Sequence, residues 1–306
     1  MASILTFEKV GKNVNDKNLL ANLSFGLQEN EIISITGKEN SGKSMIFKIL
    51  LGIHEKDKGK IFVKGMDFDV HKNDIFNLFG YLPQENIFDQ HQNVYNNLYF
   101  FARLRDLDDK SSKSNILKWS NFFDIKNELY KNFNSLSFFA KRKISFIRLL
   151  LTNPKILLLD NPTFGMSKNN KEKIWSIINK IKVNKTILFI SEDHKEIESY
   201  ADRILVLDNG NIKLNSSILN LKDNFKGNYK YEFLFKRIVP NDFVRKIKNN
   251  DSVINYKVRE DKIILTIKEK QIFFQLLKLA LDYDIINITF DKSKLNQIIN
   301  RVYKGE

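Results

Sequence analysis

The residues best suited to chemistry in this sequence lie between Gly37 and Ser44. Gly37 and the run Gly42-Lys43-Ser44 fit the spacing G-x-x-x-x-G-K-S/T, in which glycines let successive backbone N–H groups turn inward around a phosphate. The lysine of this pattern reaches the outer phosphates of a nucleotide, and the hydroxyl after it is a ligand of Mg²⁺. The predicted nucleotide-binding residues are Gly37, Lys38, Asn40, Ser41, Gly42, Lys43 and Ser44. The alternative is a flexible turn that matches the spacing by accident.

The segments on either side of this loop favour the phosphate site. Ile32–Ile35 is short, apolar and rich in β-branched residues, which predicts a buried strand. Apolar residues at helical spacing over 45–50 predict a helix that begins near Ser44. A strand, a loop and a helix in this order are the context that the pattern requires, and the helix N-terminus adds positive potential for an anion.

A carboxylate suited to Mg²⁺ is found at Asp160. It ends the apolar run Ile156–Leu159, and an acid at the end of a buried strand beside a phosphate loop holds Mg²⁺ through water. Alone this signal is weak, because many buried strands end in Asp.

The elements that must position these residues follow an α/β order. Strands are predicted at 3–10, 19–27, 32–35, 59–63, 79–82, 156–160, 186–190 and 204–207, and helices within 93–151 and at 168–182 and 194–201. The first two strands form an antiparallel pair joined by the polar segment 13–18, and Asn93 and Ser137 are predicted helix caps. Strands that alternate with helices imply a mainly parallel sheet with ligands at the carboxyl ends of its strands.

A second domain is predicted after Leu221. Strands at 229–235, 253–258, 262–268 and 285–290 and helices at 240–248, 270–282 and 291–303 follow in the order βαββαβ plus a helix. This order predicts a small α+β domain of the ferredoxin-like kind. The predicted domains are therefore residues 1–221 and 222–306.

Composition limits the remaining function classes. The 306 residues contain no cysteine, which excludes disulfides and thiolate metal sites. No apolar run reaches the ~20 residues that span a bilayer, and the N-terminal residues lack the layout of a signal peptide. The net charge of +14 suits nucleic acid or an anionic membrane surface, but the basic residues are scattered, so a compositional bias explains it as well.

Two further stretches complete a family pattern. Tyr81-Leu82-Pro83-Gln84 and the run 201–210, which begins Ala-Asp-Arg, follow the phosphate loop and the Asp160 strand at matching spacing. Together these stretches resemble the ATP-binding subunit of an ABC transporter, over about residues 3–215. The tail resembles the extra domain of some exporter-type members. The resemblance implies a P-loop NTPase fold of the ABC type, with a mainly parallel core sheet, an antiparallel β subdomain and a helical subdomain.

The resemblance also implies roles for individual residues. ATP and Mg²⁺ are the implied cofactors. Gln84 is the glutamine that touches Mg²⁺ and faces the membrane subunit, so the implied metal ligands are Ser44, Gln84 and Asp160. Ser137 keeps the serine of the signature stretch that faces the partner subunit's ATP, although it also reads as a helix cap.

Several family positions are altered in this sequence. Asn161 replaces the glutamate that polarises the attacking water; an amide cannot accept that proton, although it can still orient a water. Glu192 falls on the switch histidine, where a carboxylate repels a γ-phosphate. His194 takes that place instead only if the strand before it continues.

Contacts to the partner and to adenine are altered as well. Phe138 and Phe139 replace signature glycines, which crowds backbone approach to the partner's ATP, unless the two rings only pack in the helical subdomain. Val14 replaces the aromatic that stacks on adenine, a contact of roughly 1–3 kcal/mol, and Ser167 replaces an aspartate. The resemblance therefore implies a degenerate ATPase whose catalytic positions are Gln84, Asn161 and Glu192.

The function implied is an ATP-binding subunit of an exporter-type ABC transporter. It would lie on the cytoplasmic side of the membrane as a peripheral subunit, bound to a transmembrane permease subunit and paired in a homodimer or a heterodimer. One alternative is a subunit that senses ATP or acts as a scaffold and never hydrolyses it. The other is a soluble ABC-type protein on nucleic acid, which the single nucleotide-binding block disfavours, so no nucleic acid partner is expected.

Overall fold

The structure is a computed structural model that describes residues 3–15, 17–224, 229–267, 272–291 and 294–304. The chain divides into two compact units, unit 1 (Met1–Ile218) and unit 2 (Leu219–Glu306). The helix α8 (Ile218–Asn224) begins at the last residue of unit 1. No helix among the described residues is long and apolar enough to cross a bilayer.

Unit 1 is built on a six-stranded sheet of order β10-β9-β3-β8-β7-β6. The strands are β3 (Ile32–Gly37), β6 (Phe79–Leu82), β7 (Ile156–Asp160), β8 (Thr186–Ile190), β9 (Arg203–Asp208) and β10 (Asn211–Ser217). All neighbours pair in parallel except β9 and β10, which confirms the mainly parallel sheet. The β7 and β8 side chains are almost wholly buried, as expected for strands covered on both faces.

The last strand of this sheet, β10, was missing from the sequence prediction. It follows Asn209 and Gly210, whose φ angles are +47° and +72°. Asn-Gly with both angles positive forms the tight turn that suits a two-residue hairpin, and it returns the chain antiparallel to β9. The prediction missed β10 because only Ile212 and Leu214 of its residues are apolar, and no side chain of the strand is fully buried.

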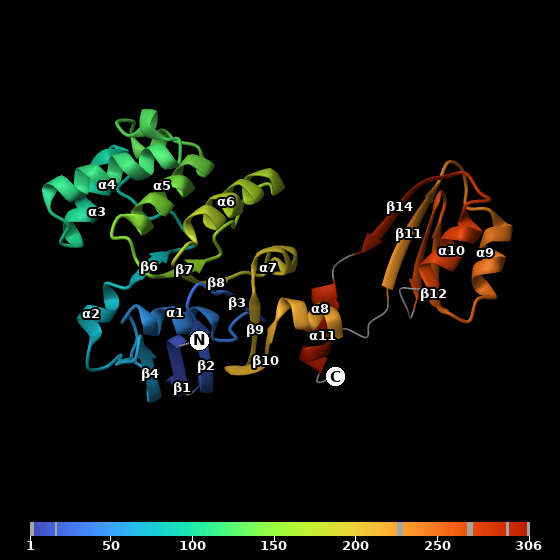
Figure 1. Cartoon of the computed structure of the whole chain (residues 1–306), viewed down its shortest axis with the longest axis horizontal. Coiled ribbons are helices and arrows are strands. Elements are labelled where there is room, and N and C mark those ends of the chain that lie inside the picture. The colour runs from blue at the N-terminus through green and yellow to red at the C-terminus, as the bar shows by residue number, and fades with distance from the viewer. Residues whose placement is uncertain (1–2, 16, 225–228, 268–271, 292–293, 305–306) are drawn as a thin grey trace. The chain divides into compact units, whose positions relative to one another are not determined.

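A second, antiparallel sheet of order β2-β1-β4-β5 packs on the same core. Its strands are β1 (Ser3–Val14), β2 (Lys17–Gln28), β4 (Lys58–Val63) and β5 (Met66–Asp67), and α1 (Lys43–Leu50) lies between the two sheets (Figure 1). Residues 13–18 were predicted only to join two strands, and this prediction was wrong for the residues at both ends of the segment, which belong to the strands. Asn13 pairs with Asn18 and Val14 with Lys17, because backbone pairing continues past the apolar alternation.

A helical group forms the rest of unit 1 (Figure 1). Its helices are α3 (Val94–Leu104), α4 (Asp109–Phe122) and α5 (Phe138–Leu150), with short 3₁₀ turns at Lys126–Glu128 and Phe133–Ser135. Asn93 accepts a hydrogen bond from the Asn96 backbone N–H at 2.7 Å, and Ser137 accepts one from Ala140 at 3.2 Å, so both predicted caps are confirmed. The other helices are α2 (Lys72–Phe76), α6 (Lys168–Ile181) and α7 (His194–Tyr200).

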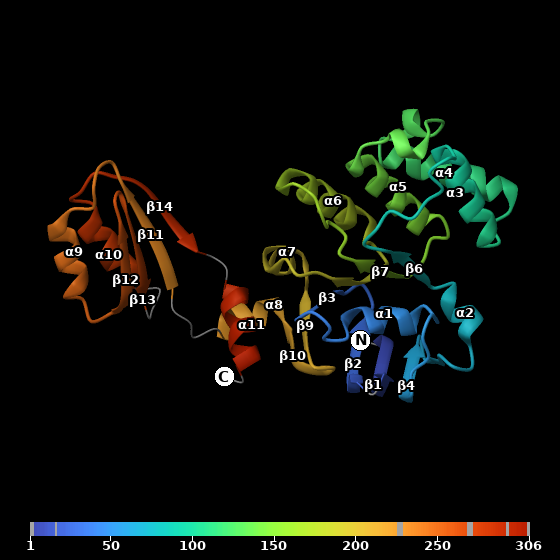
Figure 2. The same cartoon turned by 180° about the vertical axis from the view of Figure 1, so that it is seen from behind.

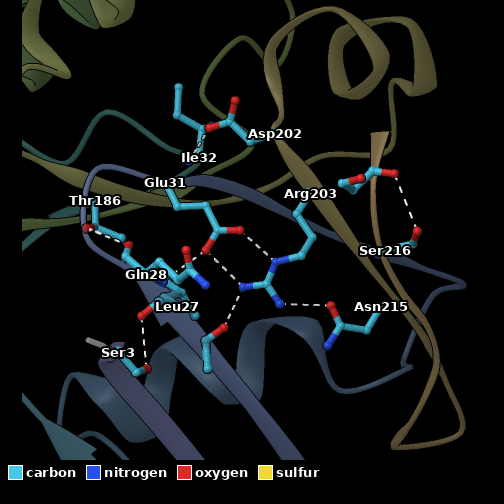
Figure 3. Close-up of polar contacts among 12 residues, drawn as sticks. Ser3, Leu27, Gln28, Glu31, Ile32, Thr186, Asp202, Arg203, Asn215 and Ser216 are labelled. Atoms are coloured by element: carbon cyan, nitrogen blue, oxygen red, sulfur yellow. Dashed lines mark hydrogen bonds and ion pairs between the residues drawn. The ribbon is translucent and has the colours of Figure 1, made fainter. Parts of the chain in front are cut away.

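Arg203 joins the central sheet to the antiparallel sheet (Figure 3). Its guanidinium donates to both carboxylate oxygens of Glu31, at 2.6 and 2.9 Å, to the Gly26 carbonyl and to Asn215. Arg203 and Glu31 are both largely buried. Two-pronged bonds to a carboxylate fix geometry as well as charge, so this cluster holds the start of β9 against β2.

Unit 2 is a four-stranded antiparallel sheet of order β12-β13-β11-β14. Its strands are β11 (Tyr229–Phe235), β12 (Val253–Arg259), β13 (Lys262–Ile267) and β14 (Ile285–Asp291), and its helices are α9 (Asn241–Lys248), α10 (Ile272–Ala280) and α11 (Lys294–Lys304). Figures 1 and 2 show α9 and α10 on one face of the sheet, where alternate residues of β11 and β13 are buried. This arrangement confirms the βαββαβ prediction. Residue 268 and residues 270, 271, 292 and 293 of the predicted elements lie outside the described residues.

Candidate nucleotide-binding site

The predicted phosphate-loop, metal and catalytic residues meet at one edge of the central sheet. The parallel strands β3, β8, β7 and β6 are neighbours in that order. Their carboxyl ends lead into the 37–44 loop, Glu192, Asp160 with Asn161, and Gln84, respectively. Residues from distant parts of the sequence therefore converge where ligands bind in open parallel sheets.

Close approach of neighbouring backbone requires glycine at both ends of the 37–44 loop. A Cβ at Gly37 would lie 2.3 Å from the Leu207 carbonyl oxygen, and a Cβ at Gly42 would lie 2.4 Å from that of Leu19. Gly42 also has a φ of +96° and stands at the N-cap of α1. The loop is thus wrapped around the N-terminus of α1, the geometry expected of an anion site.

Lys43 lies inside this loop. Its ammonium donates to the carbonyls of Gly37 and Lys38, each at 2.7 Å, and only 8% of the residue is exposed. Burial lowers the pKa of Lys43 below its ordinary value, while Glu192 acts in the opposite direction. A largely dehydrated ammonium at the mouth of a backbone nest is suited to bind phosphate oxygens.

These residues fit the triphosphate and Mg²⁺ that the loop pattern implies. The hydroxyl of Ser41 is buried and has no hydrogen-bond partner among the described residues, and it lies inside the glycine-lined loop where phosphate oxygens would accept from it. Ser44, in the first turn of α1, is exposed, and Lys38 and Asn40 are exposed on the loop, Asn40 with a φ of +57°. Mg²⁺ at such a site neutralises charge on the phosphate oxygens.

Asp160 occupies the position expected of the acidic metal ligand. Burial raises its pKa, although Arg142 and Lys43 favour the charged form. Tyr81 lies beside it, and burial together with the Asp160 charge raises the pKa of Tyr81 to about 12. The carboxylate is therefore held in a poorly hydrated place, and a cation would relieve the cost of its charge.

The side chains of Asn161 and Gln84 meet directly. The Asn161 amide donates to the Gln84 Oε1 at 2.9 Å and, more weakly, to the Asp160 Oδ1 at 3.4 Å. Asn161 has a φ of +43°, a conformation that Asn tolerates better than most residues. Where the family resemblance implies a general base, the Asn161 side chain is a hydrogen-bond donor.

Glu192 faces the phosphate loop, whereas His194 is the first residue of a helix. The Glu192 carboxylate lies 3.7 Å from the Lys43 ammonium. β8 ends at Ile190 and His194 begins α7, so the strand does not continue as far as His194. Burial lowers the pKa of His194. A carboxylate therefore pairs with the lysine that the phosphates of a nucleotide would contact.

The altered signature residues lie at the start of α5. Ser137 is exposed and caps the helix. Phe138 is 48% exposed and its ring borders Gly165, whose added Cβ would lie 3.6 Å from it. Phe139 is half-buried, with the ammonium of Lys143 over its ring at 5.2 Å. Phe138 is therefore a surface ring and not a core residue of the helical group.

Two further altered positions lie in other elements of unit 1. Val14, predicted to replace the adenine-stacking aromatic, ends β1, where it is half-buried and packs on the apolar core. Ser167 precedes α6 and makes no capping hydrogen bond with its side chain.

Two buried charged residues of this region were missed in the sequence. Arg142 of α5 donates to five acceptors in the part of the chain that the structure describes, and all five are backbone carbonyls. Glu196 of α7 accepts from Thr163, Trp175 and Ser191. The available signal was a charged residue on an apolar helical face, because Arg142 lies four residues before buried Phe146 and seven before buried Leu149.

Sequence comparison places this site in a known family. Residues 20–164 match the family described as ABC transporter. The chain is 28% identical over 235 residues to ABC transporter A family member 11 of Dictyostelium discoideum, covering 76% of this chain and 28% of that protein. It is 29% identical over 222 residues to the glucosylceramide transporter ABCA12 of Mus musculus, covering 72% of this chain and 8% of that protein. The chain thus spans less than a third of these relatives.

Solved structures share the fold. The structure of cbiO1 from Clostridium perfringens, part of the ABC transporter complex cbiONQ, aligns over 73% of this chain and 92% of that one, with a TM-score of 0.67 and 21% identity. The dimeric ATP-binding cassette MJ0796 bound to ADP and Pi aligns over 70% and 98%, with a TM-score of 0.62 and 19% identity. The family match over residues 20–164, together with this shared fold, shows that unit 1 contains an ABC transporter ATP-binding domain.

Proposed function

We propose that the chain is the ATP-binding subunit of an exporter-type ABC transporter, coupling the binding of Mg·ATP to transport through a separate membrane subunit. The observation that carries this proposal is the intact phosphate loop, with Lys43 buried in it and Asp160 on the same sheet edge. Hydrolysis is slow in this proposal because Asn161 and Glu192 stand where a base and a histidine are needed. Gln84, Ser44 and Asp160 hold Mg²⁺.

The quaternary arrangement proposed is peripheral and dimeric. The chain lies on the cytoplasmic side of the membrane, and Ser137 faces the ATP of a second ATP-binding subunit. The exposure of Ser137 and Phe138 supports this, because residues that meet a partner must lie at the surface. An ATP sensor that never hydrolyses ATP is the second candidate, favoured by the hydrogen bond between Asn161 and Gln84.

A groove next to Gln84 supports contact with a membrane subunit. Two adjoining hollows of about 350 and 530 Å³ share Ile87, Phe101 and Arg148 as lining residues. The first lies between Tyr81 and Pro83 on one side and α3 and α5 on the other. We name these hollows the docking groove. The docking groove is lined mainly by apolar side chains of the central sheet and of the helical group. A short helix bound in it would therefore contact both parts and would shift when one part moves relative to the other.

The charged residues that line the docking groove are Arg105, Arg148 and Asp89, and the Asp89 carboxylate accepts a hydrogen bond from the His91 backbone N–H. Arg148 donates to the Ile87 carbonyl at 2.5 Å, and Arg105 donates to the Phe76 carbonyl at 3.1 Å. Neither forms an ion pair with a carboxylate among the described residues. Burial lowers the pKa of Arg148 to about 10, so an acidic side chain on the entering helix would stabilise its charge. The proposed occupant is an amphipathic helix with an acidic residue, from a cytoplasmic loop of the membrane subunit.

A photocrosslinker at position 87 tests this function. The chain has no cysteine, so Ile87→Cys can be labelled alone, and Val183→Cys is a control of similar exposure (63% and 69%). With membranes of the source cells, Ile87→Cys is expected to crosslink a protein with several membrane spans, identified by mass spectrometry. Equal crosslinking from both positions, or capture of soluble proteins only, would contradict the proposal.

We propose that residues 222–306 form a separate domain with a regulatory or docking role. Its own apolar core, which contains Phe233 and Phe243, supports this division. A chain truncated after Leu221 is expected to fold and to gain the same thermal stabilisation from Mg·ATP as the full chain. Aggregation of the truncated chain would show that the two parts depend on each other for folding.

A further inference from the structure

The sharpest unexplained feature of unit 1 is the buried guanidinium of Arg142. The residue lies in the second turn of α5 and is 1% exposed. Burial lowers its pKa to about 10, although the Asp160 charge favours the protonated form. A cation without a directly bonded carboxylate is costly to bury, so its retention in place of an apolar side chain requires a reason.

All five hydrogen bonds of Arg142 go to the backbone of two loops. Its Nη1 donates to the carbonyls of Pro83 and Gln84, at 2.6 and 3.1 Å. Its Nε donates to Pro162 at 2.8 Å. Its Nη2 donates to the carbonyls of Asp160 and Asn161, at 3.4 and 3.1 Å.

These two loops carry the side chains placed around Mg²⁺. Gln84 follows β6, while Asp160 and Asn161 end β7, and Arg142 reaches both loops from the helix that begins after Ser137. A planar guanidinium with five fixed N–H donors can hold several carbonyls at once, whereas an ammonium is a single point with three donors. The contacts of Arg142 therefore fix the backbone beneath Gln84 and Asp160 without touching either side chain.

We propose that Arg142 is a positioning residue for Mg²⁺, which holds the Gln84 and Asp160 loops at the separation that both ligands need. This inference rests on the proposed binding of Mg·ATP. Residues that orient metal ligands typically change metal affinity by 10- to 100-fold when they are replaced. The 37–44 loop makes none of the five contacts, so ATP binding without the metal does not depend on Arg142.

The test measures ATP affinity and apparent Mg²⁺ affinity separately, on the full chain. ATP is titrated in EDTA, and Mg²⁺ is then titrated into the ATP-loaded chain, for the unmodified chain, Arg142→Lys and Arg142→Gln. Arg203→Lys is the matched control, because Arg203 also donates to several acceptors but lies at the β2–β9 contact. Arg142→Lys is expected to weaken Mg²⁺ binding by about tenfold and Arg142→Gln by more, towards 100-fold, with ATP affinity in EDTA changed by less than about twofold.

The control separates positioning from a general loss of structure. Arg203→Lys is expected to lower the melting temperature and to leave Mg²⁺ affinity unchanged. Equal loss of ATP and Mg²⁺ affinity in the Arg142 variants, unchanged Mg²⁺ affinity, or failure of both variants to fold would assign Arg142 a structural role and overturn the proposal. Absence of ATP binding by the unmodified chain would instead overturn the proposed function, and this inference with it.

Discussion

Mg·ATP is expected to raise the melting temperature of this chain, and Lys43→Ala is expected to abolish that increase. A ligand that binds only the folded state stabilises it by about 2.7 kcal/mol at a hundredfold excess over Kd. For a unit of this size each kcal/mol shifts Tm by about 2–4 °C. The expected increase is therefore about 5–10 °C. This increase depends on Lys43 because its ammonium is the buried cation of the phosphate loop.

Thermal melts of the full chain with and without Mg·ATP measure this effect. Lys48→Ala is the matched control, since Lys48 is an exposed lysine one turn along the same helix. Its melt should shift as that of the unmodified chain does. An unmodified chain whose Tm does not respond to Mg·ATP would remove the basis of the proposed function.

Hydrolysis is expected to be defective on both faces of the site, so that a single repair gives little activity. In ABC dimers each ATP lies between the phosphate loop of one subunit and the signature stretch of the other, as the family resemblance implies. This chain supplies Asn161 and Glu192 on the first face, and Phe138 and Phe139 on the second. Loss of base catalysis alone lowers a turnover of around 10 s⁻¹ by at least about two decades.

We therefore expect Asn161→Glu alone to give little gain in phosphate release. Asn161→Glu with Glu192→His, Phe138→Gly and Phe139→Gly is expected to give much more. Glu192→His also removes the carboxylate that lies 3.7 Å from Lys43, and with it the repulsion of a nucleotide phosphate. The measurement is phosphate release by the assembled transporter, with Lys43→Ala as the blank. Full recovery from Asn161→Glu alone would show that the other substitutions are harmless.

The central sheet could be predicted because its signals are local and strong. Four apolar residues before Asp160 and the glycine-spaced loop after Ile35 each determine an element without reference to the rest of the chain. The edge strand β10 could not be predicted in the same way. It is determined by the Asn209–Gly210 turn and by pairing with β9, and its apolar alternation is limited to Ile212 and Leu214.

The sequence pattern predicts that Gln84, Asn161 and Glu192 lie near the phosphates of a nucleotide, and the structure brings all three to the sheet edge that holds the 37–44 loop. The contacts between these residues could not be predicted. The Asn161–Gln84 hydrogen bond and the Glu192–Lys43 contact depend on rotamers and distances that only folding sets. The sequence analysis missed Arg142 because its acceptors are backbone carbonyls, and a sequence motif does not indicate which backbone carbonyls a side chain contacts.

The most direct test of the account is the chemical identity of the nucleotide that stays bound. The full chain is incubated with Mg²⁺ and ATP, separated from free nucleotide and denatured, and the released nucleotide is identified by chromatography. We predict intact ATP after long incubation, in an amount that Lys43→Ala abolishes. Bound ADP formed in a Lys43-dependent manner, at the rate of a competent enzyme, would contradict the claim that this chain binds Mg·ATP without hydrolysing it efficiently.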